Sequence, residues 1–111
     1  MASGEAPGLL SGKVVVVTGG TRGLGLAIAR LFAEHGASVV VSSRTASAAQ
    51  RAAREIDQQT GRTGAAWGMA VDVGARDAVD ALAEATIARH GHFDIWVNNA
   101  GITAPYGPSG A

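Results

Sequence analysis

Gly19, Gly23 and Gly25 follow a short run of valines, at a spacing suited to holding a phosphate group. The valines at residues 14–17 indicate a buried strand, and an amphipathic pattern that begins at Leu24 indicates a helix. Backbone N–H groups at such a strand-to-helix turn, together with the positive end of the helix dipole, attract anions. We therefore predict a turn that binds a pyrophosphate. The residues expected to form it are Gly19, Thr21, Arg22, Gly23, Leu24 and Gly25.

Polar or glycine-rich residues also follow each of the other three expected strands. Ser43 and Arg44 come after the second strand, Asp72 and Val73 after the third, and the Asn-Asn-Ala-Gly stretch at residues 98–101 after the fourth. The carboxyl ends of parallel strands lie at one edge of a sheet, and ligands of α/β proteins bind there. Turns with a purely structural role would be spread over both edges. The coincidence therefore indicates a single functional site.

These motifs, in this order, resemble those of the short-chain dehydrogenase/reductase family. The glycine spacing after Thr18 matches the TGxxxGxG motif of that family and not the commoner GxGxxG of dinucleotide-binding folds. The resemblance covers residues 10–101. It implies an oxidoreductase that transfers hydride between NADPH and a carbonyl or alcohol substrate.

The resemblance also implies a role for each motif. The glycine loop holds the pyrophosphate, Asp72 bonds the adenine amino group, and the backbone at Val73 contacts the adenine ring. Asn99, Ala100 and Gly101 close over the ribose on the nicotinamide side, and this stretch braces the sheet through the threonine that precedes the glycine loop. From the residues alone, Asp72 could also be a solvated turn residue, and the asparagines could belong to an ordinary turn.

The choice between NAD and NADP depends on the residue that ends the second strand. NAD-selective sites carry an acidic side chain there, about 20 residues after the glycines, which binds the ribose 2′-hydroxyl. Here Ser43 occupies that position and Arg44 follows it. A carboxylate would repel a 2′-phosphate, whereas a guanidinium can bind it through two hydrogen bonds. Arg22 matches a basic position of NADP-preferring relatives, although it could also be a plain surface arginine. The two arginines predict NADP(H) in preference to NAD(H).

Hydrophobic periodicity predicts four strands that alternate with three helices. The strands are expected at residues 13–18, 39–42, 65–71 and 93–97, and the helices at 23–35, 46–59 and 75–90. The positions expected to face the core are Leu24, Ile28, Leu31 and Phe32 in the first helix, Ala49, Ala52, Ala53 and Ile56 in the second, and Val79, Leu82, Ala83, Thr86 and Ile87 in the third. Gly36 should end the first helix, and Thr45 should cap the second.

Such alternation requires parallel strands joined by right-handed crossovers. The predicted fold class is α/β, a Rossmann-type doubly wound parallel sheet present in part, with four strands in the order 3-2-1-4. We expect residues 1–9 to be a flexible leader, residues 10–101 an NAD(P)-binding half-domain, and residues 102–111 a loop.

The composition is that of a soluble globular domain and argues against several other classes. Hydrophobic residues make up 47% and charged residues 16%, the formal net charge is zero, and there is no cysteine. We therefore expect neither nucleic acid nor a membrane as partner, and neither a disulfide nor a metal site. Apolar runs fall far short of the ~20 residues of a membrane helix, and the first residues do not resemble a signal peptide, so the expected location is cytoplasmic.

No residue of the chain can be assigned the acid–base chemistry of the reaction. Enzymes of the family that this sequence resembles use a Ser, a Tyr and a Lys for catalysis, and the Tyr and Lys occur as Tyr-x-x-x-Lys. Here Tyr106 is the only tyrosine, Gly110 stands four residues after it, and the only lysine is Lys13. We therefore expect no turnover from these 111 residues and no means of identifying the substrate.

Two interpretations remain open. The chain is either the amino-terminal part of an NADP(H)-dependent oxidoreductase, which its loop-like ending favours, or a stand-alone nucleotide-binding or regulatory module without catalysis. In both cases the far edge of the fourth strand lacks a predicted partner within the chain. Unpaired strand edges promote association, so we expect the chain to associate with itself.

Overall fold

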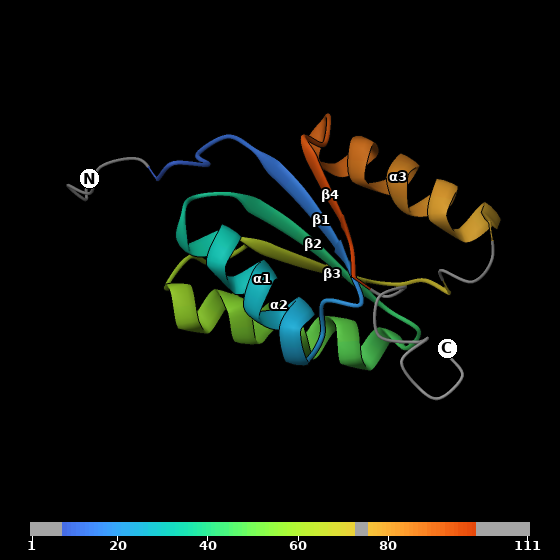
Figure 1. Ribbon diagram of the computed structural model, residues 1–111, viewed down its shortest axis with the longest axis horizontal. Helices are drawn as coiled ribbons and strands as arrows, with labels where there is room; N and C mark the ends of the chain where they lie inside the picture. The colour runs from blue at the N-terminus through green and yellow to red at the C-terminus, as the bar shows by residue number, and fades with distance from the viewer. Residues whose placement is uncertain (1–7, 73–75, 100–111) are drawn as a thin grey trace.

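Four parallel strands form a single sheet, and three helices connect them (Figure 1). The computed structural model describes residues 8–72 and 76–99, and in these the strands run in the order β3-β2-β1-β4. The elements are β1 (Val14–Thr18), α1 (Gly23–Glu34), β2 (Ser38–Ser43), α2 (Ala46–Thr60), β3 (Ala66–Ala70), α3 (Arg76–His90) and β4 (Ile95–Asn98). This arrangement confirms the predicted fold class, strand order and helices.

Valines of β1 and β2 fill the core on both faces of the sheet. Val15 and Val17 pack with residues of α1 and α2, whereas Val16 packs with Leu82 of α3. Figure 1 shows the same division, with α1 and α2 on one face and α3 on the other. Right-handed crossovers explain it, because the chain reverses direction along the sheet after β3 and the next helix must then cover the opposite face. The predicted inner face of α2 is confirmed, since its four residues, Ala49, Ala52, Ala53 and Ile56, are all buried.

The predicted inner face of α1 is wrong in part. Leu24 and Leu31 are 61% and 53% exposed, whereas the buried residues of this helix are Gly25, Ala29 and Ala33. Small side chains recur here at every fourth position, and they let the helix backbone approach the valines of the sheet closely. Of the four residues expected inside, Ile28 and Phe32 are partly buried against the core.

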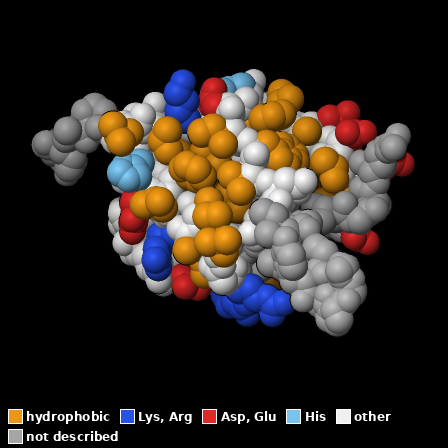
Figure 2. Space-filling view, in the orientation of Figure 1, with side chains coloured by type: hydrophobic (Ala, Val, Ile, Leu, Met, Phe, Trp, Pro, Cys, Tyr) orange, Lys and Arg blue, Asp and Glu red, His pale blue; other side chains and the backbone are white. Residues whose placement is uncertain are grey.

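The buried face of α3 also contains fewer residues than predicted. Leu82 and Thr86 are fully buried, but Ile87 is 47% exposed. Val79 and Ala83 lie between these extremes. Figure 2 shows apolar side chains gathered over α1 and, beyond it, over β4 and α3. The described part of the chain therefore carries apolar surface on three neighbouring elements.

The expected helix ends are present. Gly36 has a φ of +101°, in the left-handed region that favours glycine, directly after α1. The Oγ1 atom of Thr45 accepts a hydrogen bond from the backbone N–H of Ala48, 3.3 Å away, and so caps α2. A further contact at the end of α1 was not predicted, and it comes from Arg62, whose guanidinium donates to three backbone carbonyls there.

The fourth strand begins two residues later than expected because Asp94 is used for another purpose. Its backbone N–H donates to the carbonyl of Val14, and its carboxylate accepts from the backbone N–H of Val14, each at 2.8 Å. Nε2 of His92 lies 2.9 Å from the same carboxylate. The hydrogen bond from Val14, assisted by the charge of His92, lowers the pKa of Asp94 below its ordinary value. Regular pairing with β1 then starts at Ile95, opposite Val15.

Within the described residues, no helix combines the length and the apolar character needed to cross a membrane.

Candidate functional site

A groove of about 870 Å³ lies at the carboxyl ends of the strands. This volume is within the usual range of small-molecule sites, about 300–1,000 Å³. It is lined by Gly19, Thr21, Arg22, Gly23, Leu24, Ser42, Ser43, Arg44, Thr45, Ala48, Arg51, Val71, Asp72 and Asn99. The structure thus brings together the described residues predicted for the site, with Gly25 directly behind the lining. The other predicted residues, Val73, Ala100 and Gly101, lie outside the described residues.

The turn between β1 and α1 presents an open helix N-terminus to the groove. Gly19 and Gly23 have φ angles of +67° and +58°, which residues with a Cβ rarely adopt. Arg22 occupies the N-cap position of α1 in an extended conformation, and its side chain makes no capping hydrogen bond. The first turn of α1 also has no acidic residue. Its first N–H groups are therefore left for an anion, as at a phosphate-binding helix N-terminus.

The end of β4 holds this glycine turn in place. Nδ2 of Asn99 donates to the carbonyl of Gly19 at 3.1 Å. A Cβ at Gly25 would overlap that same carbonyl oxygen and would press against the amide nitrogen of Asn99. At the end of β1, which pairs with β4, the Oγ1 atom of Thr18 lies 3.1 Å from Oδ1 of Asn98 and 3.3 Å from the carbonyl oxygen of Val97. Among the described residues, the threonine is therefore joined to the end of β4 through Val97 and Asn98, directly before the stretch for which the brace was predicted.

Two polar atoms of the groove residues are buried without a partner among the described residues. They are Oγ of Ser42, in a residue that is 1% exposed, and Oδ1 of Asn99, in a residue that is 5% exposed. A buried polar atom that makes no hydrogen bond costs about 1–3 kcal/mol, so native structures usually satisfy such atoms. Their position in the groove is consistent with a ligand that carries hydroxyl or amino groups.

The charges around the groove favour an anionic ligand. Three arginines, Arg22, Arg44 and Arg51, line it and are exposed, and among the described residues no hydrogen bond or ion pair holds their guanidinium groups. Of the described lining residues, only Asp72 is acidic. Ser43, at the end of β2, supplies a hydroxyl that accepts from the N–H of Thr45 at 3.4 Å. The donor set of glycine turn, arginines and hydroxyls fits a phosphorylated nucleotide.

Sequence reasoning missed part of the wall formed by α2. Ala48 and Arg51 line the groove, although neither was among the residues predicted for the site. The signal was available, because Thr45, Ala48 and Arg51 follow one another at three-residue spacing, beside the buried positions Ala49 and Ala52. Ser42 and Val71, at the ends of β2 and β3, were also missed as lining residues. Among the described residues, no cluster of side chains could hold a metal ion.

Comparison with known proteins agrees with this geometry. The model of the short chain dehydrogenase family matches residues 13–109. The chain is 45% identical over 96 residues to the 3-oxoacyl-acyl-carrier-protein reductase of Chlamydia trachomatis, which covers 86% of this chain and 38% of that protein. It is 44% identical over 93 residues to 3beta-hydroxysteroid dehydrogenase 1 of Eggerthella lenta, which covers 84% of this chain and 35% of that protein. The chain therefore spans little more than a third of these relatives.

Solved structures place the same topology in larger proteins. The L-sorbose reductase of Gluconobacter frateurii, solved with NADPH and L-sorbose, superposes with a TM-score of 0.77 at 41% identity, over 86% of this chain and 36% of that one. A metagenomic short-chain oxidoreductase in complex with NADP gives a TM-score of 0.73 at 42% identity, over 81% of this chain and 39% of that one. The chain therefore belongs to the short-chain dehydrogenase/reductase family.

Proposed function

We propose that the groove binds the adenosine and pyrophosphate parts of NADP(H), in preference to NAD(H). The proposal rests on two exposed arginines that line the groove, Arg22 and Arg44. It rests also on position 43, where a serine stands and not an acidic residue. Two relatives of known structure support it, because one was solved with NADP and the other with NADPH. The residues proposed to hold the pyrophosphate are Gly19, Thr21, Arg22, Gly23, Leu24 and Gly25. Ser43 and Arg44 are proposed to bind the 2′-phosphate. Asp72 and Val73 are proposed to bind the adenine. The ribose on the nicotinamide side is proposed to contact Asn99, Ala100 and Gly101.

The proposed activity of the whole protein is hydride transfer between NADP(H) and a small carbonyl or alcohol substrate. The nicotinamide supplies or accepts the hydride when the cofactor is bound. The residues of this chain bind and orient its adenosine end. The 111 residues contain no Tyr-x-x-x-Lys pair, so we expect the chain by itself to be inactive. A nucleotide-binding module without catalysis is the alternative, since the groove would serve it equally well.

Cofactor choice is tested by Arg44→Ala in the 111-residue chain. The substitution removes a charge-assisted contact worth about 1.5–3 kcal/mol, which corresponds to roughly a ten- to hundredfold loss of affinity for NADP⁺. Affinity for NAD⁺ should change little, because its ribose carries no phosphate at that position. Titration calorimetry measures both. An equal loss for the two cofactors would show that Arg44 does not bind the 2′-phosphate.

The proposed inactivity is tested by NADPH oxidation with a panel of ketones. The 111-residue chain should show no turnover, while a chain extended to the length of its relatives should oxidise NADPH with at least one of them. Turnover by the short chain would contradict the assignment of catalysis to residues outside it. Absence of turnover in the long chain, with binding retained, would favour the module without catalysis.

A further inference from the structure

Arg51 lines the groove from the second turn of α2. It shares this wall with Thr45 and Ala48, and the groove also contains Arg44 at the end of β2. We infer that Arg51 is a further specificity residue of this site, which contacts the phosphate on the adenosine ribose from the side opposite β2. The inference rests on the proposed NADP(H) binding and adds Arg51 to the arginines, Arg44 first among them, that recognise that phosphate.

The geometry of α2 allows this contact. Arg51 comes six residues after Thr45, and an α-helix rises ~1.5 Å per residue, so the two lie about 9 Å apart along the axis. Side chains on a helix lean toward its N-terminus, and arginine is long enough to reach back over more than one turn. Arg51 lines the same groove as Arg44, Thr45 and Ala48, so this reach brings its guanidinium within range of a phosphate held beside them.

The charge of the 2′-phosphate also favours contact with more than one cationic side chain. A phosphate monoester carries a charge of about −1.5 to −2 near pH 7 and has three strong acceptor oxygens. One guanidinium neutralises only part of that charge and occupies two of the oxygens at most. Arg51 has no hydrogen bond or ion pair with another described residue, so its guanidinium is available without breaking an existing contact. Among the described lining residues, those at this wall are Thr45, Ala48 and Arg51, and none of them is acidic.

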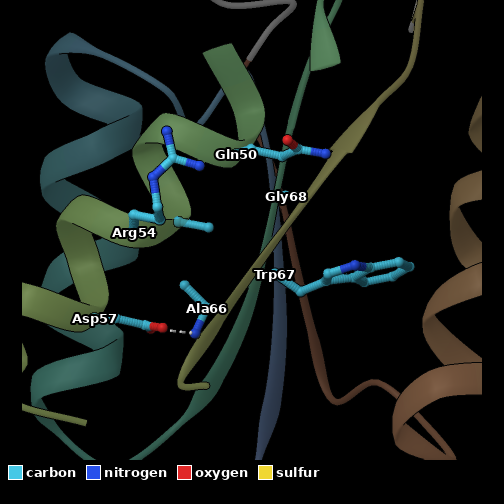
Figure 3. A pocket seen from close by; sticks show the side chains of 7 residues that line it. Gln50, Arg54, Asp57, Ala66, Trp67 and Gly68 are labelled. Atoms are coloured by element: carbon cyan, nitrogen blue, oxygen red, sulfur yellow. Dashed lines mark hydrogen bonds between the residues drawn. The ribbon is translucent and has the colours of Figure 1, made fainter. Parts of the chain in front are cut away.

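The same helix provides a matched control in Arg54. This residue lies one turn further along α2 and lines a different, smaller pocket of about 240 Å³ between α2 and β3. Figure 3 shows Gln50, Arg54 and Asp57 of α2 beside Ala66 and Gly68 of β3, with the carboxylate of Asp57 bonded to the N–H of Ala66. Both arginines are exposed, and both lack a partner among the described residues. Replacing either removes one positive charge from the same helix, but only one of them lines the proposed cofactor groove.

The experiment compares two probes that differ only in the phosphate at issue. Adenosine 2′,5′-bisphosphate and 5′-AMP are titrated calorimetrically into the wild-type chain and into Arg51→Gln, Arg51→Lys and Arg54→Gln. We expect Arg51→Gln to weaken the bisphosphate about three- to tenfold and 5′-AMP less than twofold, since an exposed charge-assisted contact is only partly desolvated. Arg51→Lys should retain part of the affinity, and Arg54→Gln should stay within twofold of wild type for both probes. Circular dichroism checks that all variants are folded.

The outcomes separate this inference from the function on which it rests. If the wild type prefers the bisphosphate and Arg44→Ala abolishes that preference, but Arg51→Gln behaves as Arg54→Gln does, NADP(H) binding stands and the role of Arg51 is refuted. An equal loss of both probes in Arg51→Gln would also refute it, because the side chain would then contact the part that they share. If the wild type binds neither probe, the proposed function and this inference fall together.

Discussion

Arg62 joins three segments of the fold through one side chain, and its removal gives the clearest stability prediction. Its Nη1 atom donates to the carbonyls of Ala33 at 2.6 Å and Ala37 at 3.0 Å, and its Nη2 atom donates to that of Gly36 at 3.1 Å. These carbonyls lie at the end of α1 and in the turn to β2, whereas Arg62 lies in the loop between α2 and β3. A cation there also interacts favourably with the negative end of the dipole of α1.

The expected loss in Arg62→Ala follows from these three bonds. A hydrogen bond to a charged group contributes about 1.5–3 kcal/mol when it is well buried. Arg62 is only half-buried, so the carbonyls regain water when it is removed, and each bond is worth about 0.5–1 kcal/mol instead. The sum is about 2 kcal/mol. For a domain of roughly 100 residues this lowers Tm by about 8–16 °C.

Chemical and thermal unfolding of three variants test this reasoning. Arg62→Ala should lose about 2 kcal/mol of unfolding free energy, and Arg62→Lys about half as much, because an ammonium keeps the charge but not the planar fork. Arg54→Ala, on the exposed face of α2, should stay within about 0.5 kcal/mol of wild type. If Arg62→Ala destabilises the chain no more than Arg54→Ala does, the three carbonyls are satisfied equally well by water and the calculation is wrong.

Three further perturbations have defined outcomes. The hydrogen bond from Val14 and the charge of His92 lower the pKa of Asp94 below 3.8, so its carboxylate stabilises the fold above that pH, and this contribution is lost as the pH falls through the folded pKa. In urea titrations Asp94→Asn should therefore be less stable than wild type at pH 6, and the difference should shrink toward pH 3. Gly25→Ala should reduce NADP⁺ affinity more than tenfold in calorimetry and destabilise the chain by about 1–3 kcal/mol, because the new Cβ overlaps the glycine turn. Leu31→Glu should shift the chain toward monomer in sedimentation, since it places a charge on the exposed apolar side of α1.

Each of these has a result that contradicts it. A stability difference for Asp94→Asn that is independent of pH would show that the carboxylate charge is not involved. Normal affinity in Gly25→Ala would mean that the turn can shift without losing its ligand. A wild-type chain that sediments as a monomer at high concentration would refute self-association itself, and Leu31→Glu would then have nothing to reverse.

The sequence predicted the sheet and the glycine turn well because each rests on a local property. Consecutive valines favour strands, and a glycine with positive φ marks a sharp turn, as at Gly19 and Gly23. Because the strands are parallel, the residues that follow them lie at one edge of the sheet, and this alone predicted that Arg44, Asp72 and Asn99 lie close together. The carboxyl-end rule therefore predicted most of the groove lining among the described residues.

Contacts between distant segments could not be predicted in the same way. Nothing near Arg62 in the sequence indicates that its guanidinium binds the end of a helix 25 to 29 residues earlier. Arg51 was not predicted as a lining residue because the periodicity of α2 separates only buried from unburied positions. An unburied position of α2 lines a groove only if the loops after the strands lie opposite it. The sequence of α2 alone does not determine where those loops lie.

The error on α1 has a physical explanation that links it to self-association. An amphipathic pattern marks apolar positions on one side of a helix, and it does not separate those that pack on the sheet from those that stay exposed. Leu31 is exposed on α1, and Figure 2 shows apolar side chains gathered over α1, β4 and α3 on one face. A large apolar residue left in water on this face gives up the roughly 1.5–3 kcal/mol that its burial would contribute. That free energy favours any polypeptide able to cover the face, and in a solution of the 111-residue chain alone the available polypeptide is a second copy.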